Sequence, residues 1–282
     1  MIAVVDYQKG NLKSVERGLI AAGGEALITA DASEIAKADA IVLPGVGAFA
    51  DAAATMCELG QMEAIRDRVR AGVPFLGICL GEHLMFEHGV EGAPEGSPAC
   101  GLGLLPGTVV AMPRYDAQGK TFKVPHVGWN TIEMPACNGG ATVPLRGEGG
   151  GNAALSSGGA GGGAARSSAA KRGLFEHGAF PGSTPQPGGE FAFPGSTPQP
   201  GSDLAFACPL FDGIAPGEYF YFTHSFIAPT GSHTIAETTH SVQFTSAVQY
   251  GDRAFGVQFH PEKSSDAGAR VLANFVAIAA RG

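Results

Sequence analysis

Residues 73–83 read VPFLGICLGEH, and a strand pattern changes into a helix pattern within this stretch. Val73–Ile78 is a short apolar run typical of a buried strand, whereas Leu80–Glu87 has a helical pattern. Between them stands Cys79 in the pattern Gly-x-Cys-x-Gly, which is that of a nucleophile elbow with Cys in place of Ser. We therefore predict that Cys79 lies in a tight turn between a strand and a helix.

Cys79 has the surroundings that a nucleophilic thiolate needs. A helix N-terminus stabilises negative charge through its dipole and its free N–H groups, so this turn favours the thiolate over the thiol. The backbone N–H of Leu80 is placed to donate to an oxyanion. The alternative is a buried structural cysteine, which is the common fate of Cys in an apolar segment. The remaining cysteines lack this turn pattern: Cys57, Cys100, Cys137 and Cys208.

A thiolate nucleophile needs a histidine partner and a group that orients the imidazole. Among the eight histidines, His260 ends the apolar run Phe255–Phe259 and precedes Pro261. Proline biases the residue before it towards extended backbone, in which residues i and i+2 project to the same side. Glu262 can therefore reach the His260 imidazole, although an unrelated surface glutamate is the alternative. Together the elbow and this pair predict a catalytic triad of Cys79, His260 and Glu262.

Short apolar runs alternate with helical patterns over residues 2–112, and this alternation predicts βαβ units with a largely parallel sheet. We therefore expect an α/β protein with an open, twisted sheet flanked by helices. The expected strands are Ile2–Asp6, Glu25–Thr29, Ile41–Leu43, Val73–Ile78, Tyr219–Thr223, His233–Thr238, Ser246–Tyr250 and Ala254–Phe259. The expected helices follow the cap Asn11, begin at Ser33, span Met62–Arg70, and run from Asp266 to about Ala280.

Residues 138–207 have a different composition, rich in Gly, Ala, Ser and Pro. The decapeptide AFPGSTPQPG occurs at 179–188 and again at 192–201, and two copies are too few for a solenoid. Such a composition cannot bury enough apolar surface to offset the entropy of ordering the chain. We expect a disordered insertion within a single domain that covers residues 1–282; a partner-binding segment is the alternative. A disulfide between Cys137 and Cys208 could close this insertion.

Composition and charge limit the possible partners. The 282 residues carry a formal net charge of −8 and no dense run of Lys and Arg, which argues against a nucleic-acid footprint. The apolar run Val271–Ala280 is too short for the about 20 residues that span a bilayer. The start of the chain lacks the pattern of a secretory leader. We therefore expect a cytoplasmic protein with reduced thiols, and the sequence indicates neither a metal nor another cofactor.

With these residues in place, the chain resembles the class I, or triad, glutamine amidotransferases, whose motifs it carries in the family order. Within this family it is similar to the glutaminase subunits of imidazole glycerol phosphate synthase, an enzyme of histidine biosynthesis. Pro-Gly-Val-Gly at 44–47, Gly-Trp-Asn at 128–130 and His-Pro-Glu-Lys-Ser at 260–264 point to this subfamily. The other matching segments are Asp6-Tyr7, Gly10-Asn11-Leu12, Ser14-Val15, Gly77 to Gly81 and Tyr221 to Phe226.

The resemblance implies that Cys79 attacks the side-chain carboxamide of L-glutamine, forms a glutamyl thioester and releases ammonia. His260 would protonate the leaving amine and then activate water, while Glu262 fixes the tautomer of His260. Further roles follow from position in the family motifs. The implied residues are Gly45, Val46, Gly47 and Leu80 for oxyanion binding, and His83, His224, Ser225 and Phe226 around the bound glutamine.

The resemblance also implies a partner chain. A separate cyclase subunit, a (β/α)₈ barrel in this family, would receive the ammonia and use it to make imidazole glycerol phosphate. Four residues match positions near the surface that meets the cyclase in the heterodimer: Trp129, Asn130, Tyr221 and Lys263.

Two positions depart from the family pattern, namely Gln8 in place of a glycine and His83 in place of a substrate-contacting glutamine. A neutral imidazole offers one donor and one acceptor, fewer than a carboxamide. His83 also lies four residues after Cys79 on the same helix face, where it could perturb the thiol or bind a metal with it. These departures leave open an impaired homologue that acts as a binding or regulatory subunit. A glutaminase subunit for another acceptor, or a Cys-His hydrolase or peptidase, are further alternatives.

Overall fold

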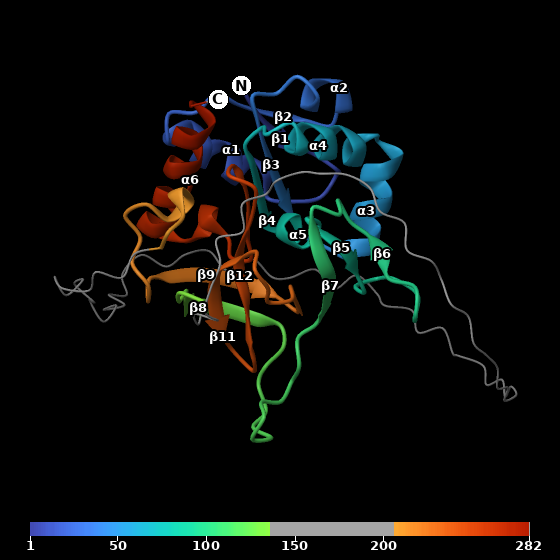
Figure 1. Cartoon of the computed structure of the whole chain (residues 1–282), viewed down its shortest axis with the longest axis vertical. Helices are drawn as coiled ribbons and strands as arrows, with labels where there is room; N and C mark the ends of the chain where they lie inside the picture. The colour runs from blue at the N-terminus through green and yellow to red at the C-terminus, as the bar shows by residue number, and fades with distance from the viewer. Residues whose placement is uncertain (136–205, 282) are drawn as a thin grey trace, which may run out of the picture. The chain divides into compact units, whose positions relative to one another are not determined.

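A seven-stranded sheet forms the centre of the structure, a computed structural model that describes residues 1–135 and 206–281 (Figure 1). The strand order is β11-β12-β13-β4-β3-β1-β2. Five strands pair in parallel: β1 (Ile2–Val5), β2 (Ala26–Thr29), β3 (Ala40–Gly45), β4 (Phe75–Cys79) and β13 (Ala254–Val257). Two strands add an antiparallel edge: β12 (Gln243–Tyr250) and β11 (Thr234–Thr239). The predicted α/β fold with a mostly parallel sheet is therefore confirmed.

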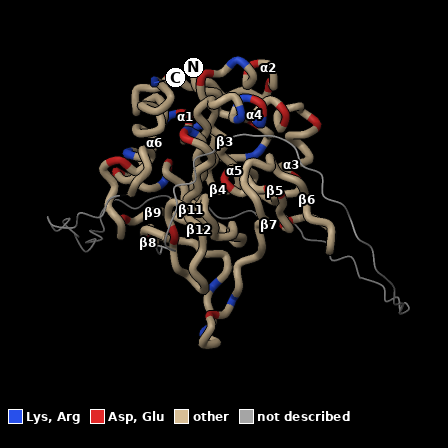
Figure 2. Tube along the Cα trace, in the orientation of Figure 1, with Lys and Arg blue, Asp and Glu red and all other residues tan. Residues whose placement is uncertain are grey.

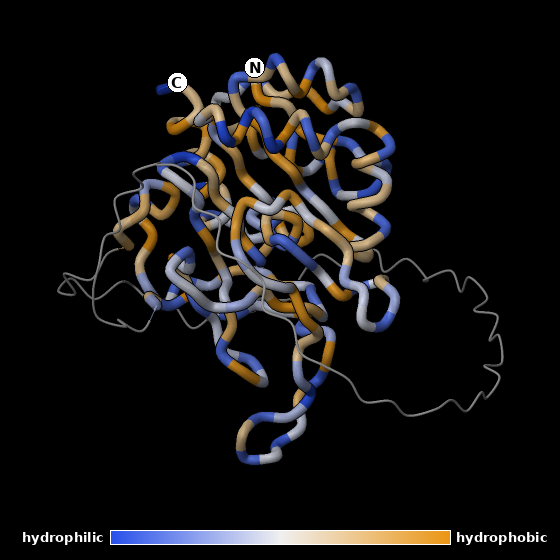
Figure 3. The backbone as a smooth tube through the Cα atoms, turned by 45° about the vertical axis from the view of Figure 1, so that its right-hand side comes forward, coloured by the Kyte–Doolittle hydropathy of each residue, from blue (hydrophilic) through white to orange (hydrophobic). Residues whose placement is uncertain are grey.

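Helices cover both faces of this sheet, and each face has its own hydrophobic cluster. Ile2 and Val4 of β1 enter one cluster, whereas Ala3 and Val5 enter the other, because successive side chains of a strand point to opposite faces. The backbone at the centre of Figure 3 is rich in orange, hydrophobic residues, and the two clusters place these residues on both faces of the sheet. The first cluster includes α1 (Leu12–Ala21) and α6 (Ser265–Ala279), and the second includes α2 (Ala32–Ile35), α3 (Phe49–Glu58) and α4 (Gln61–Arg70).

Two smaller sheets complete the described part of the chain. One has the order β10-β7-β5-β6 and the other is the two-stranded ribbon β8-β9. Their strands are β5 (Phe86–Gly89), β6 (Ala99–Cys100), β7 (Leu105–Ala111), β8 (His126–Thr131), β9 (Tyr219–His224) and β10 (Phe226–Ile227). In the ribbon, Trp129 lies opposite Tyr221 and Thr131 lies opposite Tyr219. The ribbon therefore brings together two segments that lie far apart in the sequence.

The helix predicted over residues 80–87 was wrong beyond its first turn. The helix α5 is only Leu80–His83, and Phe86–Gly89 forms the strand β5, which pairs with β6 and β7. The ring of Phe49 packs so closely on Gly89 that a Cβ there would overlap it. Backbone pairing and this close approach outweigh the helical pattern of the sequence.

The structure shows how the helix near Ser33 begins and which backbone conformation Gln8 adopts. The helix expected from Ser33 begins at Ala32, because the Asp31 side chain accepts a hydrogen bond from the Ser33 N–H and caps it. Gln8, which stands in place of a family glycine, has φ 70°. Glutamine therefore adopts at this position the left-handed backbone that glycine adopts without strain.

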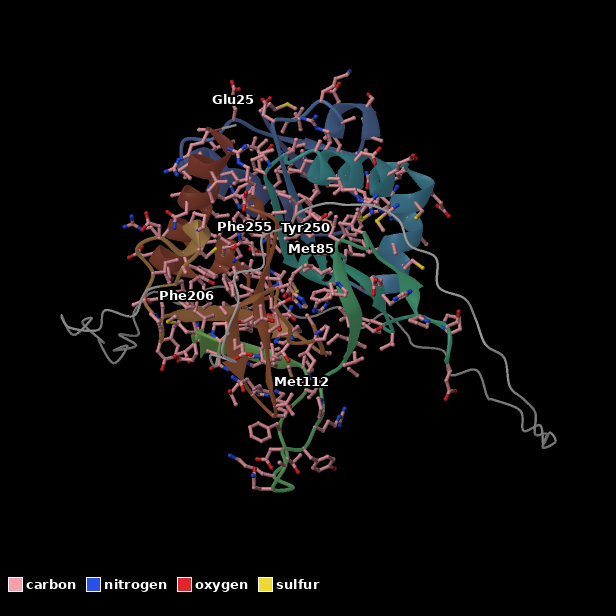
Figure 4. The ribbon with its side chains drawn as sticks, viewed as in Figure 1. Glu25, Met85, Met112, Phe206, Tyr250 and Phe255 are labelled. Atoms are coloured by element: carbon pink, nitrogen blue, oxygen red, sulfur yellow. The ribbon has the colours of Figure 1, made fainter. Side chains whose placement is uncertain are left out.

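The predicted insertion lies outside the described residues except for its last two positions. Phe206 is buried there, with its ring 4.9 Å from that of Phe211, so the globular part of the chain resumes before residue 208 (Figure 4). Cys208 is buried with a free thiol, whose pKa burial raises to about 11. Cys137 lies outside the described residues.

Charges are mixed over the described surface. Blue and red segments alternate along α2 and α4 in Figure 2 rather than separating into a basic face and an acidic face. In the described residues no helix is long and apolar enough to cross a membrane.

Candidate active site

Cys79 lies at the junction of β4 and α5 with φ 54° and ψ −106°. Such a backbone conformation is strained for a residue with a side chain and is a feature of nucleophile turns. A Cβ on Gly81 would overlap the carbonyl group of Leu43, and a Cβ on Gly77 would overlap the backbone of Gly81. The two glycines therefore let α5 start directly against β3, with Cys79 between them.

His260 follows β13 and is held by its backbone as well as by its ring. The His260 N–H donates to the carbonyl of Tyr221 at 2.9 Å, and the Ser264 hydroxyl donates to the carbonyl of His260 at 2.6 Å. The Nδ1 atom of His260 lies 3.0 Å from Oε1 of Glu262. A short 3₁₀ turn, Pro261–Lys263, brings this carboxylate to the ring, rather than the extended segment that we expected.

The ion pair of His260 and Glu262 is almost completely shielded, with side chains that are 5% and 2% exposed. Burial lowers the pKa of His260, but the hydrogen bonds and charges of Cys79 and Glu262 outweigh burial and raise that pKa to about 9. The Nδ1–H donates to Glu262, which leaves Nε2 for Cys79. The geometry therefore favours an imidazolium at His260, hydrogen-bonded to Cys79 and to Glu262.

The loop after β3 borders the same site. Gly45 is paired in register with Cys79, so the chain after Gly45 passes the nucleophile. The Tyr7 hydroxyl approaches Gly45 so closely that a Cβ there would overlap it. Val46 is 42% exposed and Gly47 has φ 102°. This arrangement places backbone groups of the loop opposite the first turn of α5, whose N–H groups have no partner inside the helix.

A cavity of about 460 Å³ opens over Cys79 at the carboxyl ends of the parallel strands. Ligands of open α/β sheets bind at this end of the strands. A second cavity of about 570 Å³ lies at the opposite ends of the strands and contains none of the predicted site residues. The first cavity is lined by Val46, Gly47, Ala48, Cys79, Leu80, His83, Glu91, Pro125, Thr223, His224, Ser225, Phe226, His260 and Lys263.

The structure thus brings most of the predicted site residues to one cavity, with Glu262 behind His260. Gly45, Trp129, Asn130 and Tyr221 do not line it. Trp129 is 41% exposed and its ring lies 6.0 Å from that of Tyr221 on the outside of the ribbon. The Asn130 side chain is used internally, because its Nδ2 donates to the carbonyl of Thr239 at 3.0 Å.

Two histidines of the cavity are neutral. Burial lowers the pKa of His83 to about 4, partly offset by a hydrogen bond to Gln258, and burial lowers the pKa of His224 to about 3. His83 does not touch the Cys79 sulfur by a hydrogen bond of its own; its Nε2 lies 2.7 Å from Oε1 of Gln258. Within the described residues no group of three or more His, Cys, Asp or Glu side chains could hold a metal ion.

Two polar residues of the site were not foreseen from the sequence. Glu91 reaches the cavity from the loop after β5, where it lies next to the first residue of α3, Phe49. Burial raises the pKa of the Glu91 carboxyl. Gln258 is fully buried and its Nε2 lies 3.7 Å from the sulfur of Cys79. The sequence held a signal for Gln258, which stands two residues before His260, but none for Glu91, whose position depends on β5.

Comparison with known families gives a direct match. The chain matches the family "Glutamine amidotransferase class-I" over residues 3–146 and 195–279. It is 34% identical to "Imidazole glycerol phosphate synthase subunit HisH" of Moorella thermoacetica, over 97% of this chain and 93% of that protein. It is 33% identical to the protein of the same name from Rhodopirellula baltica, over 98% of this chain and 96% of that protein.

Solved structures agree on the fold. "Crystal structure of glutamine amidotransferase" superposes with a TM-score of 0.55 at 15% identity, covering 99% of this chain and 98% of that chain. "Structure of PurLQS from Thermotoga maritima" superposes with a TM-score of 0.54 at 14% identity, covering 98% and 97%. At this identity the likeness concerns the fold alone.

Proposed function

Because the chain belongs to the class I glutamine amidotransferase family, we propose that it hydrolyses L-glutamine to glutamate and ammonia. We propose further that it does so as the glutaminase subunit of an imidazole glycerol phosphate synthase, in histidine biosynthesis and in the cytoplasm. One observation carries the proposal: the buried Cys79–His260–Glu262 arrangement faces a cavity in a chain similar over nearly its whole length to HisH subunits.

The geometry supports a two-step reaction. The Cys79 thiolate attacks the carboxamide carbon of glutamine, and the tetrahedral intermediate collapses to a thioester as Nε2 of His260 gives its proton to the departing ammonia. Neutral His260 then takes a proton from water, which attacks the thioester carbon and releases glutamate and the thiolate. Glu262 holds the ring with Nδ1 protonated in both steps. Backbone N–H groups of Leu80 and the loop 45–47 would stabilise each oxyanion.

The charges around the cavity fit an amino acid. Glu91 can bind the α-ammonium group of glutamine, and the segment His224 to Phe226 can bind the main-chain end of the substrate. A carboxylate that is half-buried and opposite a cationic ligand group makes a stronger ion pair than one in bulk water. His83 would complete the wall beside the reacting carboxamide.

The outer face of the ribbon supports the proposed partner. Val127, Trp129 and Tyr219 are 53%, 41% and 51% exposed, and they lie on the same face of β8 and β9 as Tyr221. An exposed apolar patch of this kind is typical of a protein interface. The Lys263 ammonium lies 6.0 Å from the centre of the Tyr221 ring, so the patch adjoins the cavity. We propose that a (β/α)₈ cyclase subunit docks here and receives ammonia.

The direct test measures glutamate release by the purified chain, alone and with the cyclase subunit and its nucleotide ligand. Hydrolysis that rises in the complex would support the proposal. No hydrolysis in the complex would contradict the proposal and favour the alternative, an impaired homologue that acts as a binding or regulatory subunit. The observation that favours this alternative is His83, which stands in place of the substrate-contacting glutamine of the family. Copurification with a different synthase would indicate another acceptor for the ammonia.

The pH dependence of hydrolysis follows from His260. This residue must be protonated to release ammonia, so kcat/KM for glutamine is expected to fall as the pH rises through about 9. Glu262→Gln keeps the shape but removes the charge that raises the pKa of His260. The decline is therefore expected at a pH lower by about 1 to 3 units. Rates from pH 6 to 10 would measure it, with the exposed Glu58→Gln as the matched control. A decline at the same pH in both variants would contradict the role of Glu262.

We also propose that the predicted insertion 138–207 lies within a single glutamine amidotransferase domain of residues 1–282, and we end it at residue 205 because Phe206 is buried. The family match leaves residues 147–194 uncovered, and the ribbon pairs Thr131 with Tyr219 on the two sides of the segment. Replacing 138–205 with a short Gly-Ser linker is expected to change the free energy of unfolding by no more than about 1 kcal/mol. Hydrolysis in the complex is expected to be largely unchanged. A large loss of activity with intact folding would show that the segment binds the partner or the substrate.

A further inference from the structure

A chain of two hydrogen bonds leads from His83 to the Cys79 sulfur. Nε2 of His83 lies 2.7 Å from Oε1 of Gln258, and Nε2 of Gln258 lies 3.7 Å from Sγ of Cys79. All three side chains are buried, with exposed fractions of 3%, 0% and 7%. Buried polar groups of this kind are held firmly in one arrangement, because an unmade hydrogen bond is costly in a dry interior.

Chemistry decides which group donates and which accepts in these two hydrogen bonds. Neutral His83 can place its one proton on Nε2 and donate it to the Gln258 carbonyl oxygen. That bond turns the amide so that its N–H₂ group faces the sulfur. The opposite orientation would place the carbonyl oxygen of Gln258 against a thiolate, where two negative groups repel each other. Burial raises the pKa of the neighbouring Glu82 carboxyl well above its usual value, which favours its neutral form.

The sulfur has two hydrogen-bond partners, which favour different protonation states. As a thiol, Cys79 can donate to the carbonyl oxygen of Thr223, which lies 3.8 Å away. The Gln258 N–H can donate to the sulfur in either state, because a thiol sulfur is a weak acceptor. A thiolate has no proton for Thr223, so loss of the proton to His260 removes that bond and strengthens the bond from Gln258. A hydrogen bond to the charged form of a group favours that form.

We infer that Gln258 is a catalytic residue that stabilises the Cys79 thiolate, and that His83 is a positioning residue that holds Gln258 in the donating orientation. The inference rests on the proposed function in one respect only, that Cys79 is the nucleophile. The same N–H would stabilise the sulfur when the thioester breaks and the thiolate leaves. His83, which departs from the family pattern, thus acts on the nucleophile through Gln258.

The test measures alkylation of Cys79 by iodoacetamide in the full chain, from pH 5 to 10, with the modified peptides quantified by mass spectrometry. In Gln258→Met, which keeps the size but removes the donor, the pH of half-maximal alkylation is expected to rise by about one unit, which means a roughly tenfold lower rate at any pH well below that midpoint. Gln258→Glu, which places an acceptor at the sulfur, is expected to raise it further. Tyr7 and His260, which also interact with Cys79, are unchanged in both variants.

His83 is tested by a matched pair. His83→Phe removes the donor to Gln258 and is expected to shift the alkylation profile in the same direction as Gln258→Met. His83→Gln retains an N–H at the position of the imidazole Nε2 and is expected to restore the original profile. A purely structural role would depend on the size of the side chain and would not separate phenylalanine and glutamine in this way.

The exposed thiols of Cys57 and Cys100 provide internal references, whose alkylation should be the same in every variant that folds. An unshifted Cys79 profile in both Gln258 variants would overturn the inference. A shift in those variants, but none in His83→Phe, would overturn the role of His83. Because alkylation requires no glutamine, these outcomes are independent of whether the chain hydrolyses glutamine.

Discussion

Glutamine hydrolysis by the Cys79→Ala variant is expected to fall by a factor on the order of 10⁶, or to the limit of detection, because no thioester can form without the sulfur. Synthesis from added ammonia is expected to remain close to normal, because free ammonia reaches the cyclase without the glutaminase reaction. Parallel assays of the complex, one with glutamine and one with an ammonium salt, would measure the two activities.

Cys57→Ala is the matched control for this variant, because it removes an exposed thiol on α3 and leaves the site untouched. Loss of both activities in Cys79→Ala would show that Cys79 is structural. Hydrolysis that persists in Cys79→Ala would contradict the proposed chemistry itself. The expected result, ammonia-dependent synthesis without hydrolysis, would separate the nucleophile from the docking surface for the cyclase.

Gly81→Ala is expected to lower the free energy of unfolding by at least about 3 kcal/mol. Losses of this size are typical of severe steric conflicts in a core. The new Cβ would overlap the backbone carbonyl oxygen of Leu43, and neither atom can move freely, because the sheet fixes Leu43 and α5 fixes the backbone that carries the Cβ. The conflict can be relieved only if α5 moves away from β3, which would also displace Cys79. Urea unfolding and near-UV circular dichroism would measure the loss.

Gly119→Ala distinguishes crowding from backbone conformation. Gly119 has φ 80° but no atom within 4 Å of an added Cβ, so alanine there meets only the cost of a left-handed backbone, about 1–2 kcal/mol. If Gly81→Ala lowers the free energy of unfolding by no more than Gly119→Ala does, then α5 packs less tightly against β3 than the structure indicates.

The sequence predicted the parts of the fold that are encoded locally. β4 and the elbow at Cys79 are adjacent in the chain, and His260 and Glu262 are two residues apart, so each pair could be read from one motif. The helix α3 was missed although Phe49, Ala52, Ala53 and Met56 are buried at helical spacing. Its many alanines gave little contrast between a buried and an exposed face.

The remaining site residues depend on contacts between distant segments. Glu91 enters the cavity because β5 pairs with β7, and that pairing replaced a predicted helix. The position of Gln258, two residues before His260, is a local signal for a site residue, but its contact with His83 is not, since His83 lies 175 positions away in the chain. Tertiary pairing decides these positions, and a single sequence carries no direct record of it.

The place of β13 in the sheet has a consequence for how the living cell makes this protein. β13 comes late in the chain, yet it lies beside β4, and His260 follows it directly. Chains are synthesised from the N-terminus, so β1 to β4 leave the ribosome long before His260. Until β13 takes its place, Cys79 lacks the imidazole of His260. The order of translation therefore completes the triad only when the last parallel strand has joined the sheet, so a nascent chain without β13 carries the nucleophile but not its acid–base partner.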